Sequence, residues 1–182
     1  MTGPALALPT VDVHRSFVEA MAEFRAEGRG GPSDHSMVGG ELRGFEFDTA
    51  EQFAVFVQWL LDQRLEGSPR AAHMVPSTTY WWVHDGQYLG RIAIRHRLTP
   101  SLLEIGGHIG YDVRPSARRR GHATAMLAAA LGRARELGIS SALISCAVEN
   151  VASRRVIEAN GGVLEDERNG TLRFWTPTTR ST

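Results

Sequence analysis

The chain has 182 residues, of which 42% are hydrophobic, and its 20 basic side chains balance its 20 acidic ones. This length suits one domain with a full core over residues 1–182. The zero net charge gives no electrostatic reason to expect a nucleic acid or a membrane as partner. The one cysteine excludes an intramolecular disulfide, and no apolar run approaches the length of a membrane span. We therefore expect a cytoplasmic protein.

The first third of the sequence predicts two helices joined by a loop. Residues 1–9 have the character of a flexible arm, and Thr10 or Asp12 can cap a helix that continues to about residue 27. Residues 28–44 contain six glycines and one proline, a composition that predicts a long mobile loop. Such a loop suits a lid over a bound substrate.

A second helix is indicated by a capping box, in which Thr49 and Gln52 satisfy each other's backbone donors. We expect this helix to end at Gly67. Its predicted apolar face consists of Phe53, Phe56, Val57, Leu60 and Leu61.

From residue 78 onward the pattern changes to strands. Two strands flank the Asp85-Gly86 turn, residues 99–102 lead to a third strand at 107–113, and a long helix is expected over 121–137. The apolar run 142–148 predicts a buried strand parallel to 107–113, followed by a helix at 151–160 and a hairpin at Asn169-Gly170. This order predicts an α/β fold: a mixed, mostly antiparallel sheet with a central parallel strand pair, flanked by helices.

The junction between the third strand and the long helix has the properties of an anion site. It carries Arg118, Arg119 and Arg120, then Gly121, His122 and Ala123. A helix N-terminus presents free N–H groups and the positive end of its dipole, and arginine adds bidentate phosphate donors. A solvated helix start is the plainer alternative for such a charge run.

This junction resembles a known family. The pattern Arg118-x-x-Gly121-x-Ala123 is similar to the Q/R-x-x-G-x-G/A signature of the GCN5-related N-acetyltransferases (GNATs), and Tyr111-x-Val113-x-Pro115 resembles the strand that precedes it. In that family the loop binds the pyrophosphate of coenzyme A. The matched motifs span residues 78–176.

A second match follows downstream. Asn150 and Ser153 fit the family's N-x-x-A/S-x-x-(L/V)-Y-x-x-x-G segment, whose Asn contacts the pantetheine arm. Where the family often has an acidic Tyr, this sequence has Ile157, so the usual general acid is missing. Asn150 also suits an ordinary helix N-cap.

The resemblance implies a single-domain GNAT fold and an acyltransferase that moves the acetyl group of acetyl-CoA directly to a primary amine of a small molecule. A protein or peptide amine as acceptor, or a non-catalytic acyl-CoA-binding module, stays open. We expect a monomer or homodimer. The residues expected to bind the cofactor are Tyr111, Val113, Arg118, Arg119, Arg120, Gly121, His122, Ala123, Asn150 and Ser153.

Two side chains are candidates for the general base. His108 lies on the central strand before the loop, and Glu104 lies nearer the start of that strand. Histidine has a suitable unperturbed pKa of ~6.5, although a satisfied structural histidine is the plainer interpretation. Asp112 is expected to anchor Arg114 or an arginine of the loop.

The remaining reactive side chains suggest no further chemistry. The seven histidines show no spacing typical of a metal site, so we expect no metal. Cys146 lies in an apolar strand and suits a small core residue. Trp81 and Trp82 face opposite sides of one strand; one suits the core, and the other suits an acceptor pocket.

Overall fold

A seven-stranded sheet organises the protein, of which the computed structural model describes residues 3–179. The strand order is β1-β2-β3-β4-β5-β7-β6. All neighbours are antiparallel except β4 and β5, which are parallel, so the predicted mixed sheet is confirmed. The strands are β1 (Ala5–Ala7), β2 (Ser77–His84), β3 (Gln87–Arg95), β4 (Ile109–Val113), β5 (Ser141–Ala147), β6 (Val163–Arg168) and β7 (Thr171–Pro177).

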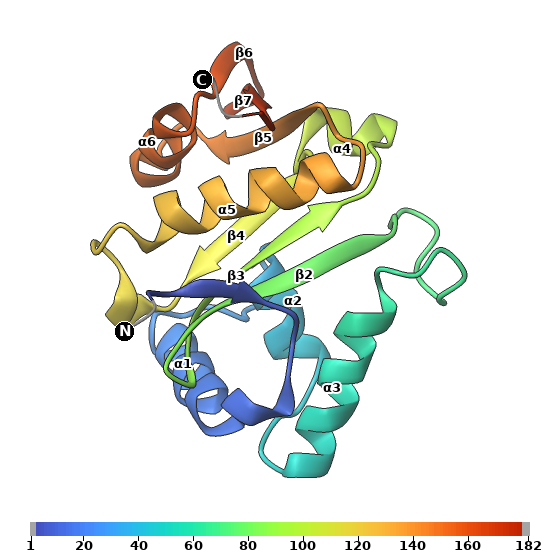
Figure 1. Ribbon diagram of the computed structural model, residues 1–182, viewed down its shortest axis with the longest axis vertical. Helices are drawn as coiled ribbons and strands as arrows, with labels where there is room; N and C mark the ends of the chain where they lie inside the picture. Colours follow the sequence, from blue (N-terminus) through green and yellow to red (C-terminus); the bar gives the residue numbers. More distant parts are fainter. Residues whose placement is uncertain (1–2, 180–182) are drawn as a thin grey trace.

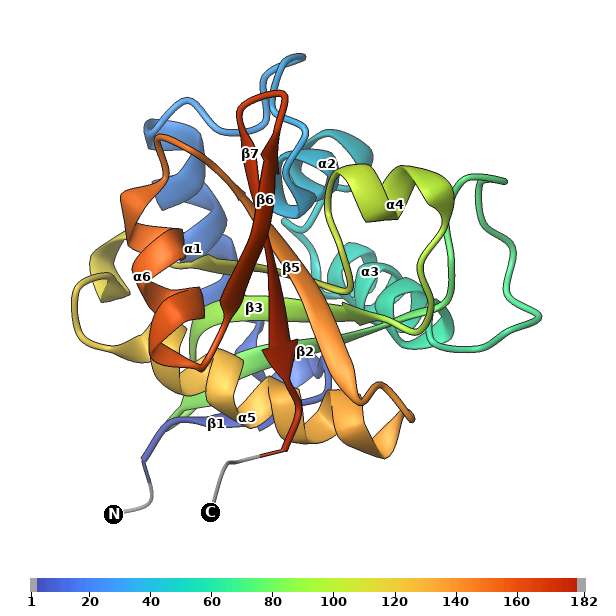
Figure 2. The ribbon, with the colours of Figure 1, turned by 90° about the horizontal axis from the view of Figure 1, so that it is seen from above.

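Helices cover both faces of this sheet (Figures 1 and 2). They are α1 (His14–Ala26), α2 (Met37–Gly44), α3 (Ala50–Asp62), α4 (Pro100–Glu104), α5 (His122–Glu136) and α6 (Val151–Ala159), with short 3-10 turns at Val11–Val13 and Pro115–Ala117. In Figure 1, α1, α2 and α3 gather below β2 and β3, whereas α5 and α6 lie towards β5 and β7. None of these helices is both long enough and apolar enough to cross a membrane within the described residues.

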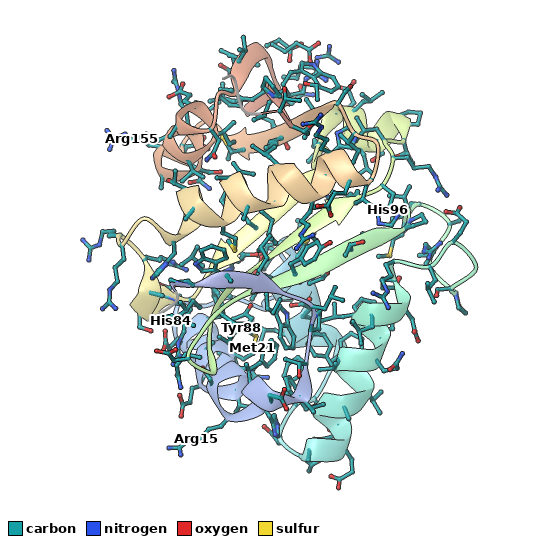
Figure 3. All side chains as sticks on the ribbon, viewed as in Figure 1. Arg15, Met21, His84, Tyr88, His96 and Arg155 are labelled. Carbon is teal, nitrogen blue, oxygen red and sulfur yellow. The ribbon has the colours of Figure 1, made fainter. Side chains whose placement is uncertain are left out.

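The sheet therefore separates two hydrophobic cores. The core under α1 and α3 is aromatic and includes Phe17, Trp81 and Tyr88; Figure 3 shows Met21 and Tyr88 inside it. The core under α5 and α6 is mainly aliphatic and includes Ile92 and Ile157. Alternation along β2 sends Trp81 into the first core and Trp82 into the second, so both indoles are buried.

Local capping explains several helix starts. The Thr10 hydroxyl accepts from the backbone N–H of Asp12, and Thr49 and Gln52 form the predicted capping box at the start of α3. Asn150 accepts from the N–H of Ser153 and so caps α6. The helix α3 ends at Asp62 and not at residue 67, because the Asp62 carbonyl turns to accept from the N–H of Leu65.

Three predicted loops contain regular structure. Within residues 1–9, of which 1 and 2 lie outside the described residues, Ala5–Ala7 pairs with β2 as an edge strand. Residues 28–44, predicted to be a mobile loop, contain α2, which starts where Ser36 accepts from the N–H of Gly39. The link at 99–102 begins α4, capped by Thr99. Glu104 therefore ends a helix and does not lie near a strand start.

The parallel pair of β4 and β5 is irregular. β4 and β5 are in register only at Ile109 and Ile144 and then diverge. Gly107, just before β4, has φ +60°, and a side chain there would meet the Leu143 carbonyl. Glycine at this position therefore permits the close approach that holds the two strands together at one end and leaves them apart at the other.

Candidate functional site

A cavity of about 560 Å³ lies where β4 and β5 diverge. We call it the cofactor cavity. Its walls come from the end of β4, the loop into α5, the first turns of α5 and α6, and one residue that follows α1. Its lining residues are Arg29, Tyr111, Asp112, Val113, Ala117, Arg118, Arg119, Gly121, His122, Ala123, Thr124, Asn150, Ala152, Ser153 and Val156.

The backbone of β4 presents hydrogen-bonding groups to the space between the strands. The Arg114 N–H donates to Leu89, and the Arg95 N–H donates to His108, so even-numbered residues of β4 pair with β3. In an antiparallel ladder the odd-numbered residues then point their N–H and C=O groups the other way. Because β5 is in register only at Ile109, the backbone groups of Tyr111 and Val113 face the gap.

The loop before α5 has the conformation of an anion site. Arg119 and Gly121 both adopt left-handed backbone angles, with φ of 60° and 80°, and Gly121 is the N-cap of α5. Successive N–H groups in such conformations converge into a concavity that binds anions, next to the positive end of the helix dipole. The phosphate site at the arginines and Gly121 stays a prediction, and this loop is where it would lie.

The three arginines of the loop are not equivalent. The Arg118 guanidinium donates two bonds of 2.9 Å to the Glu27 carboxylate and one of 3.1 Å to the Val113 carbonyl. It therefore ties the loop to the end of α1. Arg119 lines the cofactor cavity, whereas Arg120 is not among the lining residues.

Two hydroxyls meet in the wall of the cofactor cavity. The Oη atom of Tyr111 lies 2.7 Å from the Oγ atom of Ser153. Burial raises the pKa of the Tyr111 phenol to about 12, and the bond to Ser153 offsets part of that rise. Tyr111 is thus a hydrogen-bond donor and not an anion at neutral pH. Asn150 combines its place in the wall with its role as the cap of α6.

Arg29 is a charged lining residue that the sequence analysis missed, as it also missed Ala117, Thr124, Ala152 and Val156. It bridges the Asp34 carboxylate at 2.9 Å and the Asp112 carboxylate at 3.0 Å. The prediction that Asp112 anchors Arg114 or a loop arginine is wrong, since Arg114 pairs with Glu23 on α1. Burial raises the pKa of Asp112, and Arg29 offsets part of the rise. Nothing local in the sequence connects two residues 83 positions apart.

His108 lies outside the lining of the cofactor cavity, and its hydrogen bonding fits a structural residue. Its Nδ1 atom accepts from the Leu143 backbone N–H at 2.9 Å, which places the proton of the neutral ring on Nε2. Burial, with Arg95 nearby, holds the pKa of His108 below its ordinary value. The lone pair that a general base would use is therefore already engaged.

Glu104 and Ile157 are also outside that lining. The Glu104 carboxylate pairs with Arg168 at 2.7 Å on the surface. Ile157 is fully buried in the core under α5 and α6, on the far side of α6 from solvent. A tyrosine at this position would have to enter that core. Position 157 therefore contributes apolar packing and no acidic group.

Trp82 contacts the cavity wall from the core under α5 and α6. Its indole Nε1 atom donates to Nδ1 of His122, which lines the cavity, at 3.3 Å. Cys146 is buried, as expected for a core residue. Among residues 3–179, no three His, Cys, Asp or Glu side chains cluster as metal ligands would.

A splayed parallel strand pair, with an anion-binding loop at its open end, defines the class of acyl-CoA-dependent transferases that the sequence motifs resemble. The family model described as "Acetyltransferase (GNAT) domain" matches residues 44–163. The chain belongs to the GNAT acetyltransferase family. It is accordingly an acyltransferase that uses acetyl-CoA as its donor. No curated protein sequence gives a significant match to this chain.

Solved structures share the fold over nearly the whole chain. The microcin C7 self-immunity acetyltransferase MccE, in complex with acetyl-CoA and AMP, has a TM-score of 0.66 at 12% identity, covering 97% of this chain and 93% of that one. RimL, the ribosomal L7/L12 alpha-N-protein acetyltransferase, in complex with coenzyme A, has 0.64 at 18%, with coverages of 97% and 95%. The acetyltransferase from Salmonella typhimurium that modifies the N-terminal serine of L7/L12 has 0.60 at 19%, with coverages of 97% and 96%.

Proposed function

We propose that this chain acts as one domain that transfers the acetyl group of acetyl-CoA directly to the primary amine of a small molecule. The observation that carries the proposal is the cofactor cavity, which opens where β4 and β5 diverge and ends at the N-terminus of α5. Acetyl-CoA supplies the activated acetyl thioester. Everything else has to come from the residues around the cavity.

The residues present fit the donor at both ends. The loop from Arg119 to Ala123 offers converging N–H groups and positive charge for the pyrophosphate. The backbone of Tyr111 and the N–H of Val113 offer strand-like hydrogen-bonding groups to the amides of the pantetheine arm, while the Val113 carbonyl accepts from Arg118. Asn150 and Ser153, at the start of α6, form another part of the cavity wall.

Proton transfer sets two demands of different size. An alkylammonium with a pKa near ~10.4 costs roughly 4–5 kcal/mol to neutralise at pH 7. The leaving thiol resembles cysteine, with a pKa near ~8.5, and leaves more easily. Because the pKa of Tyr111 is about 12, its hydroxyl, paired with Ser153, keeps its proton at neutral pH and would be available as a hydrogen-bond donor to the leaving sulfur.

The base role is assigned to neither His108 nor Glu104, since both are engaged elsewhere. We infer that the enzyme binds the amine after it has lost one proton to solvent. The proton that the nitrogen must lose after it attacks the thioester then goes to water. The value of kcat/KM should then rise with pH and level off only when the pH approaches the pKa of the amine itself. A plateau near pH 7 for an amine of pKa ~10 would instead require a side-chain base.

The α2 side of the sheet supports a small acceptor. The methyl group of Met37 packs so closely on Gly110 that a Cβ atom there would lie 2.8 Å from it. Arg29 fastens the preceding segment to Asp112. This face of β4 is therefore covered, which narrows the approach of an acceptor to the thioester.

The test is a thiol-release assay with acetyl-CoA against a panel of amines. The panel should hold alkylamines, polyamines, amino acids, amine-bearing antibiotics and peptides with free N-termini. We expect turnover with a small amine and little with peptides, and none in Gly121→Val. Efficient turnover of peptides alone would identify a protein acetyltransferase. Coenzyme A binding without turnover of any amine would identify a binding module.

A further inference from the structure

A single hydrogen bond couples the hydrophobic core to the proposed phosphate site. The Nε1 atom of Trp82 on β2 lies 3.3 Å from the Nδ1 atom of His122, the first residue of α5. Trp82 is 5% exposed and packed against α5, so its indole has little freedom to turn. An indole N–H can only donate. The Nδ1 atom of His122 must therefore be the acceptor.

This contact fixes the tautomer of His122. When Nδ1 carries the lone pair, the single proton of the neutral imidazole is on Nε2. Burial, with Arg120 of the same loop and His84 on the β2–β3 hairpin (labelled in Figure 3) nearby, holds the pKa of His122 below its ordinary value. The ring is neutral at pH 7 and has one free donor, Nε2–H.

The position of that donor suggests its purpose. His122 lines the cofactor cavity directly after Gly121, the N-cap of α5. The backbone N–H groups of this helix start already favour an anion. We propose that Trp82 is a positioning residue that holds His122 as a neutral Nε2–H donor to a pyrophosphate oxygen of coenzyme A. This proposal rests on the cofactor placement proposed above.

Variants of His122 separate its two nitrogen atoms. His122→Gln keeps a donor near the Nε2 position but has no acceptor at the Nδ1 position that Trp82 faces, whereas His122→Asn keeps an acceptor near Nδ1 but does not reach the ligand. By calorimetry with coenzyme A, His122→Asn and His122→Leu should each weaken binding by about tenfold, because hydrogen bonds to charged groups are among the stronger ones. His122→Gln should bind more tightly than either. The opposite order would overturn the proposal.

Variants of the tryptophans test the positioning role. Trp82→Phe keeps a ring in the core but removes the N–H, and should weaken coenzyme A binding ~3-fold to 10-fold. Trp81→Phe is the matched control, since Trp81 is the adjacent buried indole on the opposite face of β2. It should leave the affinity unchanged. Equal affinities for the two variants would remove Trp82 from the site.

A spectroscopic signal distinguishes positioning from simple packing. The chain has four tryptophans, so its ¹⁵N–¹H spectrum should show four indole peaks, and the one lost in Trp82→Phe belongs to Trp82. His122→Leu should move that peak far more than the other three. An unmoved Trp82 peak would show that the hydrogen bond does not form in solution.

Failure of this inference and failure of the proposed function give different results. If Gly121→Val loses coenzyme A binding while His122→Leu and Trp82→Phe keep it, the cofactor cavity stands and the role of the Trp82–His122 pair is wrong. If all three variants keep wild-type affinity, the cofactor binds elsewhere and both proposals fall.

Discussion

The two sides of β4 are built by different means. On the side of α5, the cofactor cavity depends on backbone groups: the ladder edge of Tyr111 and Val113, the left-handed turn at Gly121 and a helix N-terminus. On the side of α2, the structure depends on partly buried charged side chains, with Arg29 between Asp34 and Asp112. Backbone sites can be recognised in a local sequence pattern, whereas pairs of distant side chains cannot.

The two sides of β4 should also differ in how much they contribute to the stability of the fold. The Arg91–Glu41 pair joins β3 to α2 with both side chains at least nine-tenths buried. A charge taken out of water is stable only while its partner stays. The α2 side should therefore respond to substitution mainly through folding, and the α5 side mainly through ligand binding.

The largest expected effect is on the α2 side. Arg91→Met leaves the Glu41 carboxylate buried without its partner, and should lower the free energy of unfolding by about 3–5 kcal/mol in urea denaturation. Arg133→Met is the matched control, because Arg133 forms a surface pair with Glu136. Its effect should be below about 1 kcal/mol. Similar values for both variants would mean that the Arg91–Glu41 pair is not a buried, mutually dependent one.

The next effect is on the α5 side. Gly121→Val places a β-branched residue at φ 80°, where it disturbs the turn and covers the N–H groups of the loop. Coenzyme A affinity should fall by well over ~10-fold in calorimetry, since a charge-assisted site is lost. The fold should survive, because no atom lies within 4 Å of the added Cβ atom.

A glycine inside α5 provides the control for this variant. Gly132→Ala also adds a side chain into open space, eleven positions further along the chain, inside the helix that Gly121 caps. It should leave coenzyme A affinity unchanged. If Gly121→Val also binds normally while folded, the loop is not the cofactor site.

A smaller effect should follow from Arg118→Ala. The guanidinium is already bound to Glu27 and to the Val113 carbonyl, and the pair with Glu27 is about 40% exposed. We expect coenzyme A binding to weaken only ~2-fold to 3-fold, as for loss of an exposed ion pair. Glu27→Gln should reproduce this change by calorimetry. A loss as large as that of Gly121→Val would show that Arg118 binds phosphate directly.

The smallest effect concerns acid stability at His108. A histidine whose folded pKa is lowered stabilises the protein above ~6.5, its unfolded pKa, and that stability is lost as pH falls below this value. His108→Asn keeps an acceptor for the Leu143 N–H but does not titrate. Between pH 7.5 and 5, measured by urea denaturation, it should therefore lose less stability than the wild type.

The same variant tests the base role that the sequence suggested. With Nδ1 engaged by Leu143, His108→Asn should keep kcat within about tenfold of the wild type at pH 7. Loss of a general base typically costs ~10²–10⁴ in rate. A decrease of that size, in a folded variant with normal coenzyme A affinity, would identify His108 as the general base.

Most strands and helices from β2 to β7 could be predicted from the sequence alone. Alternating and helical periodicities, the Asp85-Gly86 and Asn169-Gly170 turns and the Thr49–Gln52 capping box act over a few residues, so the hairpins and helix starts that they predict appear in the structure. The loop from Arg118 to Ala123 could be predicted for the same reason: a helix N-terminus and a glycine turn are local features. The family match confirms the resemblance that these residues carried.

Which distant side chains face one another could not be read from the sequence and became visible in the fold. Arg29 meets Asp112 across 83 residues, Trp82 meets His122 across 40, and Glu27 takes up the Arg118 guanidinium that the sequence assigned to phosphate. Ordering of the glycine-rich 28–44 segment into α2 likewise depends on contacts such as Met37 on Gly110. Such contacts arise when the sheet brings distant segments together, and their energies depend on burial, which no local pattern records.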